Sequence, residues 1–330
     1  MPLSPAPLSL EQTVDGLRAA GEATRLRVLG LLAREELAVA ELARILEQSQ
    51  PRVSRHLRLL TEAGLVERFP DGAWVFYRLT GREPWRGWML ALLGATEGGG
   101  VSPADAERLA AVQADRAAAA AAYFARSAPR WDEIPSLYVA EAAVERAVSR
   151  AAGEGRLGRL VDLGTGTGRM LTLLGPRADA ALGIDLSQQM LNVARRQVAE
   201  AGLGRVELRH GDILATGLPD GEADRVVIHQ VLHYLADPAA AVAEAARLLR
   251  PGGRLVVADF APHGLEFLRA EHQHRRLGFS DAELNGWLEA AGLAANPPLA
   301  LPPERADGLT VKIWSADRAA ADLPQHRRAA

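Results

Sequence analysis

The feature that most constrains the fold of this chain is a series of alternating glycines within residues 161–171. Residues 160–163 are apolar except for one aspartate and predict a buried strand, which is followed by Gly164, Gly166 and Gly168 and then by a helix. Glycines at alternate positions remove side chains from places where a ligand would have to touch the backbone. The helix that follows would direct unpaired N–H groups and the positive end of its dipole towards the same ligand. The pattern therefore predicts a nucleotide-like ligand at the end of this strand.

The spacing of the glycines distinguishes between classes of nucleotide-binding protein. A dinucleotide fingerprint has the order G-x-G-x-x-G, but its last glycine would fall on Arg169, which is too bulky for close packing between helix and strand. The spacing present is G-x-G-x-G, with Asp162 two residues before the first glycine. This run resembles the first motif of the class I S-adenosylmethionine-dependent methyltransferases.

Four later segments resemble the same family and occur in the family's order. They are residues 181–185, which end in an aspartate, residues 208–213, residues 223–230 and residues 248–257. The resemblance implies an α/β domain with a doubly wound, Rossmann-like sheet. It also implies S-adenosylmethionine (SAM) as the cofactor and S-adenosylhomocysteine (SAH) as its product.

The resemblance assigns cofactor-binding roles to residues at the ends of these strands. It implies that Asp185 accepts both ribose hydroxyls and that Asp212 binds the adenine amine, although NAD enzymes place an acid like Asp185 in a similar position. His229 or Gln230 would touch the methionine end of SAM. The expected cofactor-binding residues are Asp162, Gly164, Thr165, Gly166, Gly168, Asp185, Leu186, Gly211, Asp212, Ile213, His229 and Gln230.

Two polar residues after the fourth strand, His233 and Tyr234, are the candidates for a catalytic role. SAM carries its own activated methyl group, so the protein mainly has to align the acceptor and exclude water. His233 could act as a general base if the acceptor is a hydroxyl or an amine. Alternatively, both side chains only line the pocket, and the sequence leaves both interpretations open.

The N-terminal part of the chain predicts a winged helix–turn–helix domain. Helices are expected at residues 24–34, 39–46 and 50–64, followed by strands at residues 65–69 and 74–79 that form a hairpin. Over roughly residues 15–95 this layout is similar to the ArsR/SmtB family of transcription regulators. In that family the second helix of the motif enters the major groove of double-stranded DNA. The resemblance also implies a homodimer, formed through the helix expected at residues 84–93.

The expected DNA contacts lie on the second helix of this motif and on the hairpin. Arg52 and Arg55 would reach bases or phosphates, while Arg68 and Arg78 would hold the DNA backbone. His56 either contacts a phosphate or packs at the helix edge, and both remain open. The full set is Gln48, Ser49, Gln50, Arg52, Ser54, Arg55, His56, Arg58, Arg68 and Arg78.

The chain contains no cysteine, which excludes several kinds of chemistry. Metal-sensing relatives carry Cys-x-Cys where this chain has Ala38 and Ala40, and no histidine occurs between residues 56 and 210. We therefore expect no metal in this half, and none at His272 and His274, because residues i and i+2 of a helix point to different faces. Arsenic methyltransferases act through cysteines, so that activity is not expected. Quinone-type and other small-molecule acceptors remain open.

The length of 330 residues suggests two domains. We expect a winged helix domain at residues 1–97, a linker and long helix at 98–134, a methyltransferase domain at 135–316 and a disordered tail at 317–330. No apolar run is long enough to span a bilayer, and the first residues lack the order of a signal peptide, so a cytoplasmic protein is expected. Because the net charge is only −3, DNA binding must rely on a local basic patch.

Two functions fit these observations. The first is a transcription regulator whose DNA affinity is modulated by SAM or SAH. The second is an active small-molecule methyltransferase whose DNA-binding domain regulates its own gene or tethers the enzyme. The sequence does not decide whether the methyltransferase domain turns over a substrate.

Overall fold

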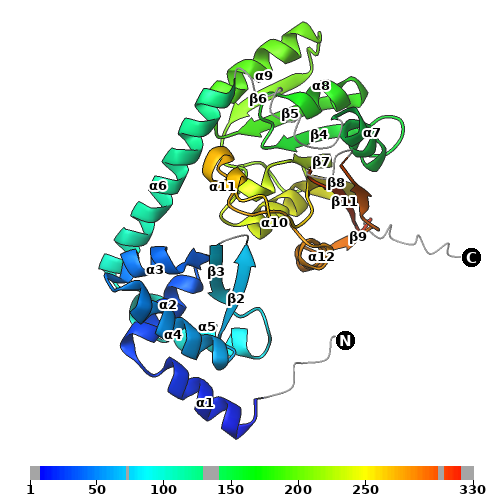
Figure 1. Ribbon diagram of the computed structural model, residues 1–330. Helices are drawn as coiled ribbons and strands as arrows, with labels where there is room; N and C mark the ends of the chain where they lie inside the picture. Colours follow the sequence, from blue (N-terminus) through cyan, green and yellow to red (C-terminus); the bar gives the residue numbers. More distant parts are fainter. Residues whose placement is uncertain (1–7, 72–73, 129–140, 304–307, 321–330) are drawn as a thin grey trace, which may run out of the picture. The chain divides into compact units, whose positions relative to one another are not determined.

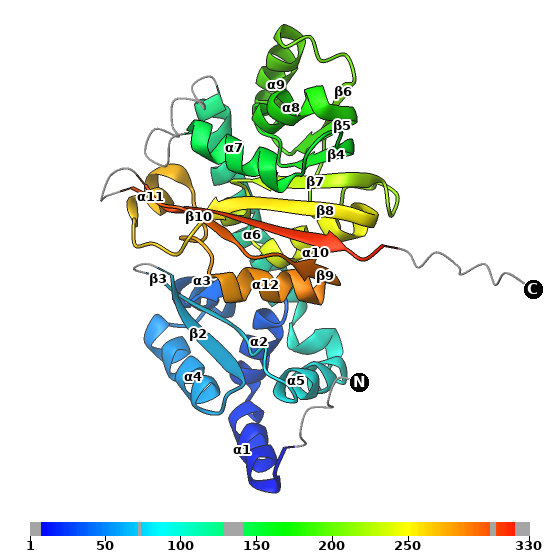
Figure 2. The same ribbon diagram turned by 90° about the vertical axis from the view of Figure 1, so that its right-hand side faces the viewer.

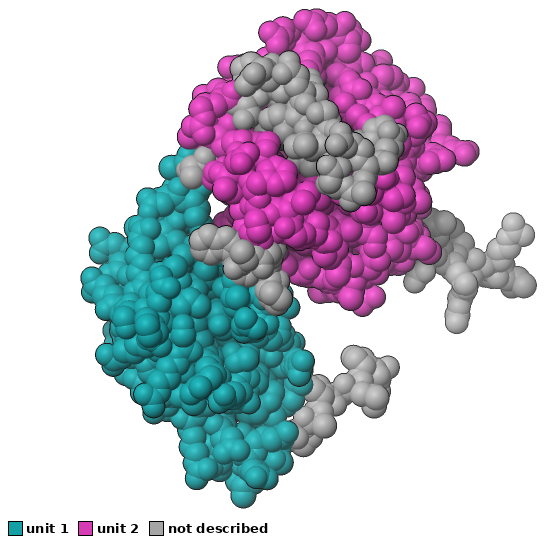
Figure 3. All heavy atoms as spheres, viewed as in Figure 1, with its two compact units in different colours: residues 1–119 teal, residues 120–330 magenta. Residues whose placement is uncertain are grey.

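The computed structural model describes residues 8–71, 74–128, 141–303 and 308–320 (Figure 1). The chain divides into two compact units, residues 1–119 and residues 120–330, which are coloured separately in Figure 3. The boundary falls inside the long helix α6 (Pro103–Ser127), so the two ends of this helix belong to different units. Within the described parts of the chain, no helix combines the length and apolar character needed to cross a membrane.

The first unit has the winged helix–turn–helix layout that the sequence predicts. Strands β2 and β3 form the expected antiparallel hairpin, and the short strand β1 pairs with β3 on its other side. Helix α4 follows a turn at Glu47, which has a left-handed φ of 53°, and it buries Val53, Leu57 and Leu60. The elements are α1 (Leu10–Ala20), α2 (Ala23–Leu32), β1 (Leu37–Ala38), α3 (Val39–Leu46), α4 (Gln50–Glu62), β2 (Val66–Asp71), β3 (Trp74–Leu79) and α5 (Trp85–Gly94).

The second unit contains a sheet in the order β10-β11-β8-β7-β4-β5-β6, with β9 paired to β11 (Figure 2). Strands β4 to β8 run parallel, and β11 is antiparallel to β8. The strands are β4 (Gly158–Leu163), β5 (Ala178–Asp185), β6 (Val206–His210), β7 (Ala223–His229), β8 (Leu249–Phe260), β9 (Leu293–Ala295), β10 (Leu299–Leu301) and β11 (Val311–Arg318). The order reverses beside β4, and ligands of doubly wound sheets bind at such a reversal, beyond the carboxyl ends of the strands.

Helices cover both faces of this sheet. Helices α7, α8 and α9 pack on one face through Val148, Leu171 and Val198, and α10 and α12 pack on the other through Val242 and Leu288. The helices are α7 (Glu141–Ala151), α8 (Arg169–Leu174), α9 (Gln188–Glu200), α10 (Pro238–Leu248), α11 (Phe267–His272) and α12 (Asp281–Ala290). The central strands are therefore buried on both sides, and only their ends can present polar groups to a ligand.

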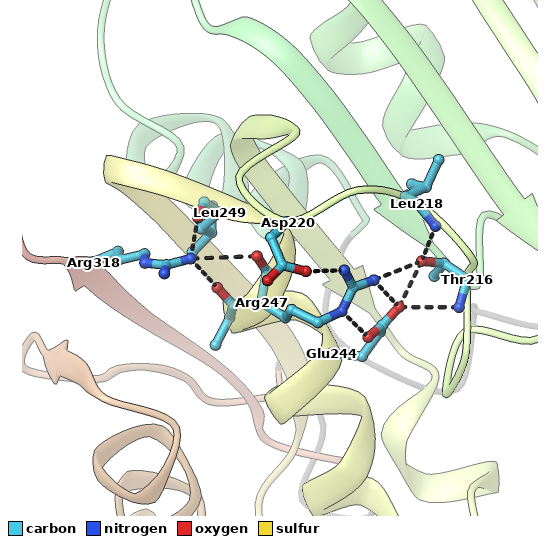
Figure 4. A network of polar contacts seen from close by, with 8 residues as sticks. Thr216, Leu218, Asp220, Glu244, Arg247, Leu249 and Arg318 are labelled. Carbon is cyan, nitrogen blue, oxygen red and sulfur yellow. Dashed lines mark hydrogen bonds and ion pairs between the residues drawn. The ribbon is translucent and has the colours of Figure 1, made fainter.

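An ion-pair network holds α10 to the segment between β6 and β7 (Figure 4). Glu244 Oε1 accepts hydrogen bonds from the amide and the hydroxyl of Thr216, at 3.0 and 2.6 Å. Arg247 binds Glu244 through Nε, at 2.7 Å, and also binds Asp220. The Arg247 guanidinium and the Thr216 donors lower the pKa of Glu244 to about 2. The network ties a surface loop to a helix that covers the sheet.

The end of β11 corrects one expectation from the sequence. Asp317 and Arg318 were assigned to a disordered tail, but both belong to β11. Asp317 accepts two hydrogen bonds from Arg254 on β8, at 2.7 and 3.0 Å. Arg318 donates to the carbonyl of Ala246 at 3.1 Å. These charges act as partners for the sheet and for α10, so their polarity does not indicate disorder here.

Candidate functional site

The glycine-rich turn connects β4 to α8 at the reversal of the sheet. Gly164, Gly166 and Gly168 have φ angles of 75°, 54° and 85°, a left-handed region that glycine adopts without steric cost. The amides of Gly164 and Thr165 both donate to the carbonyl of Ile184 on β5, at 2.8 and 3.0 Å. The turn is therefore fixed to the neighbouring strand.

The three glycines differ in their surroundings. A Cβ atom on Gly164 would lie 2.5 Å from the side chain of Val231, and one on Gly168 would lie 3.1 Å from Ala194. These two glycines allow close packing against neighbouring segments. A Cβ atom on Gly166 would meet no atom within 4 Å. Gly166 thus presents a bare backbone to open space, which is the side available to a ligand.

Asp162 lies beneath this turn and is only 1% exposed. Its Oδ2 accepts a hydrogen bond from the hydroxyl of Thr165 at 2.6 Å, while no described residue bonds its Oδ1. Burial raises the pKa of Asp162 to about 7, because a carboxylate removed from water loses its hydration. One carboxyl oxygen of Asp162 is therefore buried without a partner among the described residues.

Asp185, at the end of β5, is held in place by backbone donors. Its Oδ2 accepts from the amide of Gly166 at 2.9 Å, and its Oδ1 accepts from the amide of Ser187 at 2.7 Å. Burial raises the pKa of Asp185 above its ordinary value. The next residue, Leu186, is an exposed apolar side chain. A fixed carboxylate beside an apolar surface suits a nucleoside, whose sugar is polar and whose base is flat.

The segment after β6 lies against the same strand end. The amide of Gly211 donates to the carbonyl of Asp185 at 3.0 Å. Asp212 is exposed and accepts from the amide of Leu214 at 2.9 Å, whereas Ile213 is buried. The structure therefore places Gly211, the residue before Asp212, against the backbone of Asp185.

The segment after β7 reaches the turn from the other side. Val231 contacts Gly164, as described above, and Gln230 has a left-handed φ of 52°. The amide of Gln230 donates to the carbonyl of Ala258 on β8 at 2.7 Å. Burial lowers the pKa of His229 to about 4, so its imidazole is neutral at pH 7 and can both donate and accept hydrogen bonds.

His233 lies in a short helical turn, Leu232–Tyr234, and its side chain is 2% exposed. Its Nδ1 lies 2.8 Å from Oδ1 of Asp259, which is fully buried near the end of β8. The sequence analysis did not select Asp259. An acid near the end of an otherwise apolar strand was the available signal, since a buried carboxylate needs a partner. Tyr234, the other candidate, is half-buried and its ring centroid lies 4.1 Å from that of His233.

The two histidines near α11 have separate partners. His272 Nδ1 lies 2.8 Å from the hydroxyl of Tyr123, whereas the ring of His274 stacks against His233 with the centroids 4.1 Å apart. Among the described residues, no three His, Asp or Glu side chains are arranged to hold a metal ion.

The residues expected to contact DNA divide into exposed and engaged groups. Gln48 is half-buried, and its amide donates to the hydroxyl of Thr24 at 3.3 Å. The exposed group consists of Ser49, Gln50, Arg52, Ser54, Arg55 and Arg58 on or beside α4, together with Arg68 on β2. Five of these polar side chains lie on α4, and Arg68 lies on β2. Together they form a surface of the kind that can face a DNA groove.

Arg78 and His56 are engaged within the first unit. Arg78 forms ion pairs with Glu67, at 3.0 Å, and with Glu36, at 3.4 Å. The His56 side chain is 13% exposed, and its Nδ1 lies 3.5 Å from Glu22. Burial lowers the pKa of His56.

Comparison with known families agrees with this division into two units. Residues 22–68 match the family described as bacterial regulatory protein, arsR family, and residues 161–257 match the methyltransferase domain family. The chain joins an ArsR-family helix–turn–helix to a methyltransferase domain. The methyltransferase match runs from the strand before the glycine turn to β8 and so contains the site described above.

Individual relatives align with the methyltransferase half. Demethylmenaquinone methyltransferase of Thermus thermophilus is 38% identical over 143 residues, which cover 42% of this chain and 64% of the relative. Phosphatidylethanolamine N-methyltransferase of Cereibacter sphaeroides is 40% identical over 105 residues, covering 32% of this chain and 51% of the relative. The chain thus spans less than two thirds of the length of these curated relatives.

A solved structure is similar in fold. It comes from a Haloferax volcanii complex between the Trm112 methyltransferase activator and a methyltransferase. The similarity has a TM-score of 0.52 at 20% identity and covers 62% of this chain and 99% of the other.

Proposed function

We propose that this protein is a DNA-binding transcription regulator whose DNA affinity changes when SAM or SAH binds its methyltransferase domain. The observation that carries the proposal is helix α6, which belongs to both units. Its first part is ion-paired to the helix–turn–helix, and its last part contacts segments beside the candidate cofactor site. A continuous helix with both attachments can transmit a change in one unit to the other.

The first part of α6 is bound firmly within the DNA-binding unit. Arg27 on α2 forms two hydrogen bonds, of 2.7 and 2.5 Å, with Asp105, whose side chain is completely buried. Arg116 pairs with Glu35 at 2.7 Å and also with Glu41 in the first turn of α3. Paired and buried charges of this kind are costly to separate, so this part of α6 should move together with α2 and α3.

Helix α6 also contacts the turn that precedes α4. Arg108 pairs with Glu47, the left-handed turn residue, at 2.5 Å, and donates to the carbonyl of Ile45 at 3.4 Å. Arg44, at the end of α3, pairs with Asp115 at 2.5 Å. A displacement of α6 would therefore act on the turn that sets the position of the proposed recognition helix.

The last part of α6 contacts the methyltransferase unit through two aromatic residues. The Tyr123 hydroxyl lies 2.8 Å from His272 on α11, and the ring of Phe124 lies edge-on to Tyr234, with the centroids 4.8 Å apart. Tyr234 follows the strand end that approaches the glycine turn. A ligand that shifts this segment would act on α6, and coupling of about 1–3 kcal/mol would be ordinary for such a switch.

The residues at the glycine turn fit SAM. Gly166 offers a bare backbone, Asp185 a fixed carboxylate and Leu186 an exposed apolar surface, while Asp162 has an unpartnered oxygen. We propose that the Asp185 carboxylate binds the ribose hydroxyls and that the base packs beside Leu186. When bound, SAM supplies an activated methyl group. Both ligands, DNA and SAM, occur in the cytoplasm, which is the location that we propose.

We further propose a homodimer formed through the first unit. Among the described residues of this unit, three large apolar side chains are exposed: Leu10 and Leu17 on α1, with exposed fractions of 82% and 49%, and Leu90 on α5, with 43%. Exposed apolar side chains on two helices suit an interface. Two copies of α4 related by a twofold axis could then enter neighbouring major grooves.

The second candidate is an active methyltransferase whose DNA-binding unit regulates its own gene or tethers the enzyme. The buried pair of His233 and Asp259 favours it, because a structure that only senses SAM does not need a base. The names of the relatives point to different acceptors, a demethylated menaquinone and a phospholipid amine. We therefore propose a small-molecule acceptor.

The test is fluorescence anisotropy at fixed salt on DNA from upstream of the gene, since phosphate contacts make affinity salt-dependent. DNA binding is measured without ligand, with saturating SAM and with saturating SAH. We expect a shift of about 5-fold or more with at least one ligand. Arg116→Gln should bind SAM and DNA but lose the shift, and Arg126→Gln, an exposed arginine on the same helix, serves as its control. No shift in the unaltered protein would refute the switch.

A further inference from the structure

The pair of His233 and Asp259 is built in the way expected of a general base. Nδ1 of His233 lies 2.8 Å from Oδ1 of Asp259, which also accepts the amide of Phe260 at 2.8 Å. Both side chains are almost completely shielded from water. A carboxylate at Nδ1 places a proton on that nitrogen and leaves Nε2 as the proton acceptor. No described residue bonds Nε2.

The imidazole of His233 has a second histidine ring and a carboxylate with one unpartnered oxygen as neighbours. The ring of His274 stacks on it, with centroids 4.1 Å apart and planes 32° apart. Burial keeps the pKa of His274 far below its ordinary value, so His274 adds no second charge. Oδ2 of Asp259 has no partner among the described residues. The Asp259 carboxylate is therefore not neutralised by another cation and can stabilise an imidazolium at His233.

The position of the pair connects it to the candidate cofactor site. Val231, two residues before His233, is the side chain that a Cβ atom on Gly164 would strike. Gln230, one residue earlier, is bonded to Ala258, the neighbour of Asp259. The segment that carries the imidazole therefore runs directly from the glycine turn.

We propose that His233 is a catalytic base that accepts the proton of an aromatic hydroxyl group, as in a phenol or a hydroquinone, and that Asp259 is its positioning residue. This proposal rests on the methyltransferase activity proposed above. In the step, the O–H bond of the acceptor breaks and its proton moves to Nε2. The electron pair stays on the oxygen, which becomes a phenolate, and the imidazolium keeps its Nδ1 proton, which remains hydrogen-bonded to Asp259. The imidazolium later returns its extra proton to water.

The aromatic side chains around His233 indicate a flat acceptor. Tyr234 covers the imidazole at 4.1 Å, and Phe124 meets Tyr234 edge-on at 4.8 Å. Both rings are half-buried. Phe260 lies on another side of the imidazole, with a centroid distance of 5.0 Å. Aromatic rings pack edge-to-face or offset against other rings, and a phenolic ring fits such a wall better than an aliphatic amine.

The test uses nitrophenol, nitrocatechol and nitronaphthol, whose phenolate forms absorb at longer wavelength than the neutral forms. Each is added to the full-length protein without SAM, at a pH below the pKa of the free compound. We expect a phenolate band on binding, and we expect it to be lost in His233→Asn and weakened in Asp259→Asn. The asparagine at residue 233 can still donate a hydrogen bond to Asp259, so the fold is kept while the base is removed. Unchanged SAM affinity and unfolding temperature in the variants check this.

A second readout follows methyl transfer to phenols of graded acidity. His233→Asn should slow the transfer to weakly acidic phenols by about 10²–10⁴-fold and the transfer to nitrophenols much less, because these are already ionised. A band of equal strength in His233→Asn, or no band with any of the three compounds in the unaltered protein, would overturn the proposal. The band is recorded without SAM and without DNA. The proposed base can therefore fail this test while the change of DNA affinity with SAM or SAH is observed, and the base can pass it while that change is absent.

Discussion

Replacing Asp162 with asparagine tests the electrostatics of the site without any ligand. The side chain is 1% exposed, and burial raises its pKa from 3.8 to about 7. In the unfolded chain the carboxyl releases its proton above pH 3.8, but in the folded chain it does so only near pH 7. The folded state therefore loses stability as the pH rises through this interval, by at most about 4 kcal/mol at 1.36 kcal/mol per pKa unit.

Asparagine has the same shape and cannot ionise, so it avoids this loss. Its amide oxygen can still accept the Thr165 hydroxyl. Water that enters the site and local relaxation reduce the effect, so we expect Asp162→Asn to raise the free energy of unfolding at pH 8 by about 2 kcal/mol. At pH 4 the variant and the unaltered protein should be nearly equal.

The assay is urea unfolding at both pH values, followed by hydrogen exchange of peptides from β4 and β5. Asp179→Asn is the control, because its side chain is 57% exposed and pairs with Arg156 at the surface of the same unit. The control should show little change at either pH. An Asp162→Asn protein that is less stable at pH 8, or whose difference from the unaltered protein does not depend on pH, would refute the reasoning.

Four further predictions concern the network in Figure 4, the glycine turn and the DNA surface. The pKa of Glu244 falls from 4.5 to about 2, so Glu244→Gln should lower the free energy of unfolding at pH 7. The shift corresponds to roughly 3 kcal/mol, which we reduce to about 2 kcal/mol because Arg247 is partly exposed. In urea unfolding this loss should fade between pH 4.5 and 2. Gly168→Val should destabilise the second unit more than Gly166→Ala does, because its φ is left-handed and its Cβ would also lie 3.1 Å from Ala194. Gly166→Ala should fold with a loss of about 1–2 kcal/mol for its left-handed φ and bind SAM more weakly by calorimetry. Arg55→Ala should lower the slope of log affinity against log salt by about 1 in anisotropy titrations, and a slope that does not change would exclude a phosphate contact by Arg55.

Local signals in the sequence were enough to predict most of the elements. The capping box of Ser9 and Gln12 starts α1, and Pro51 lies in the first turn of α4. The glycine spacing and the apolar strands placed β4, β5 and β7 at the reversal of the sheet. These features depend on neighbours within a few residues, and the physical preferences of such short segments are visible in the sequence.

Contacts between distant segments were not predictable in this way. Strand β1 has two residues, too few for an alternating pattern, and it forms because Leu37 and Ala38 pair with β3. To predict a role for Asp259, one would have had to know that His233 lies beside β8. The ion pairs of α6 join residues that are more than sixty positions apart. An exposed arginine and a paired one look the same in a sequence, as Arg78 illustrates.

The place of β11 in the sheet affects the order in which the chain can become active during synthesis. β11 pairs with β8 along residues 311–317 and carries Trp314, which is fully buried. The methyltransferase core therefore cannot close until this late segment has left the ribosome. The DNA-binding unit is complete some two hundred residues earlier, or at least about ten seconds at ordinary rates of translation. For that interval a nascent chain holds a folded helix–turn–helix without the unit proposed to control it.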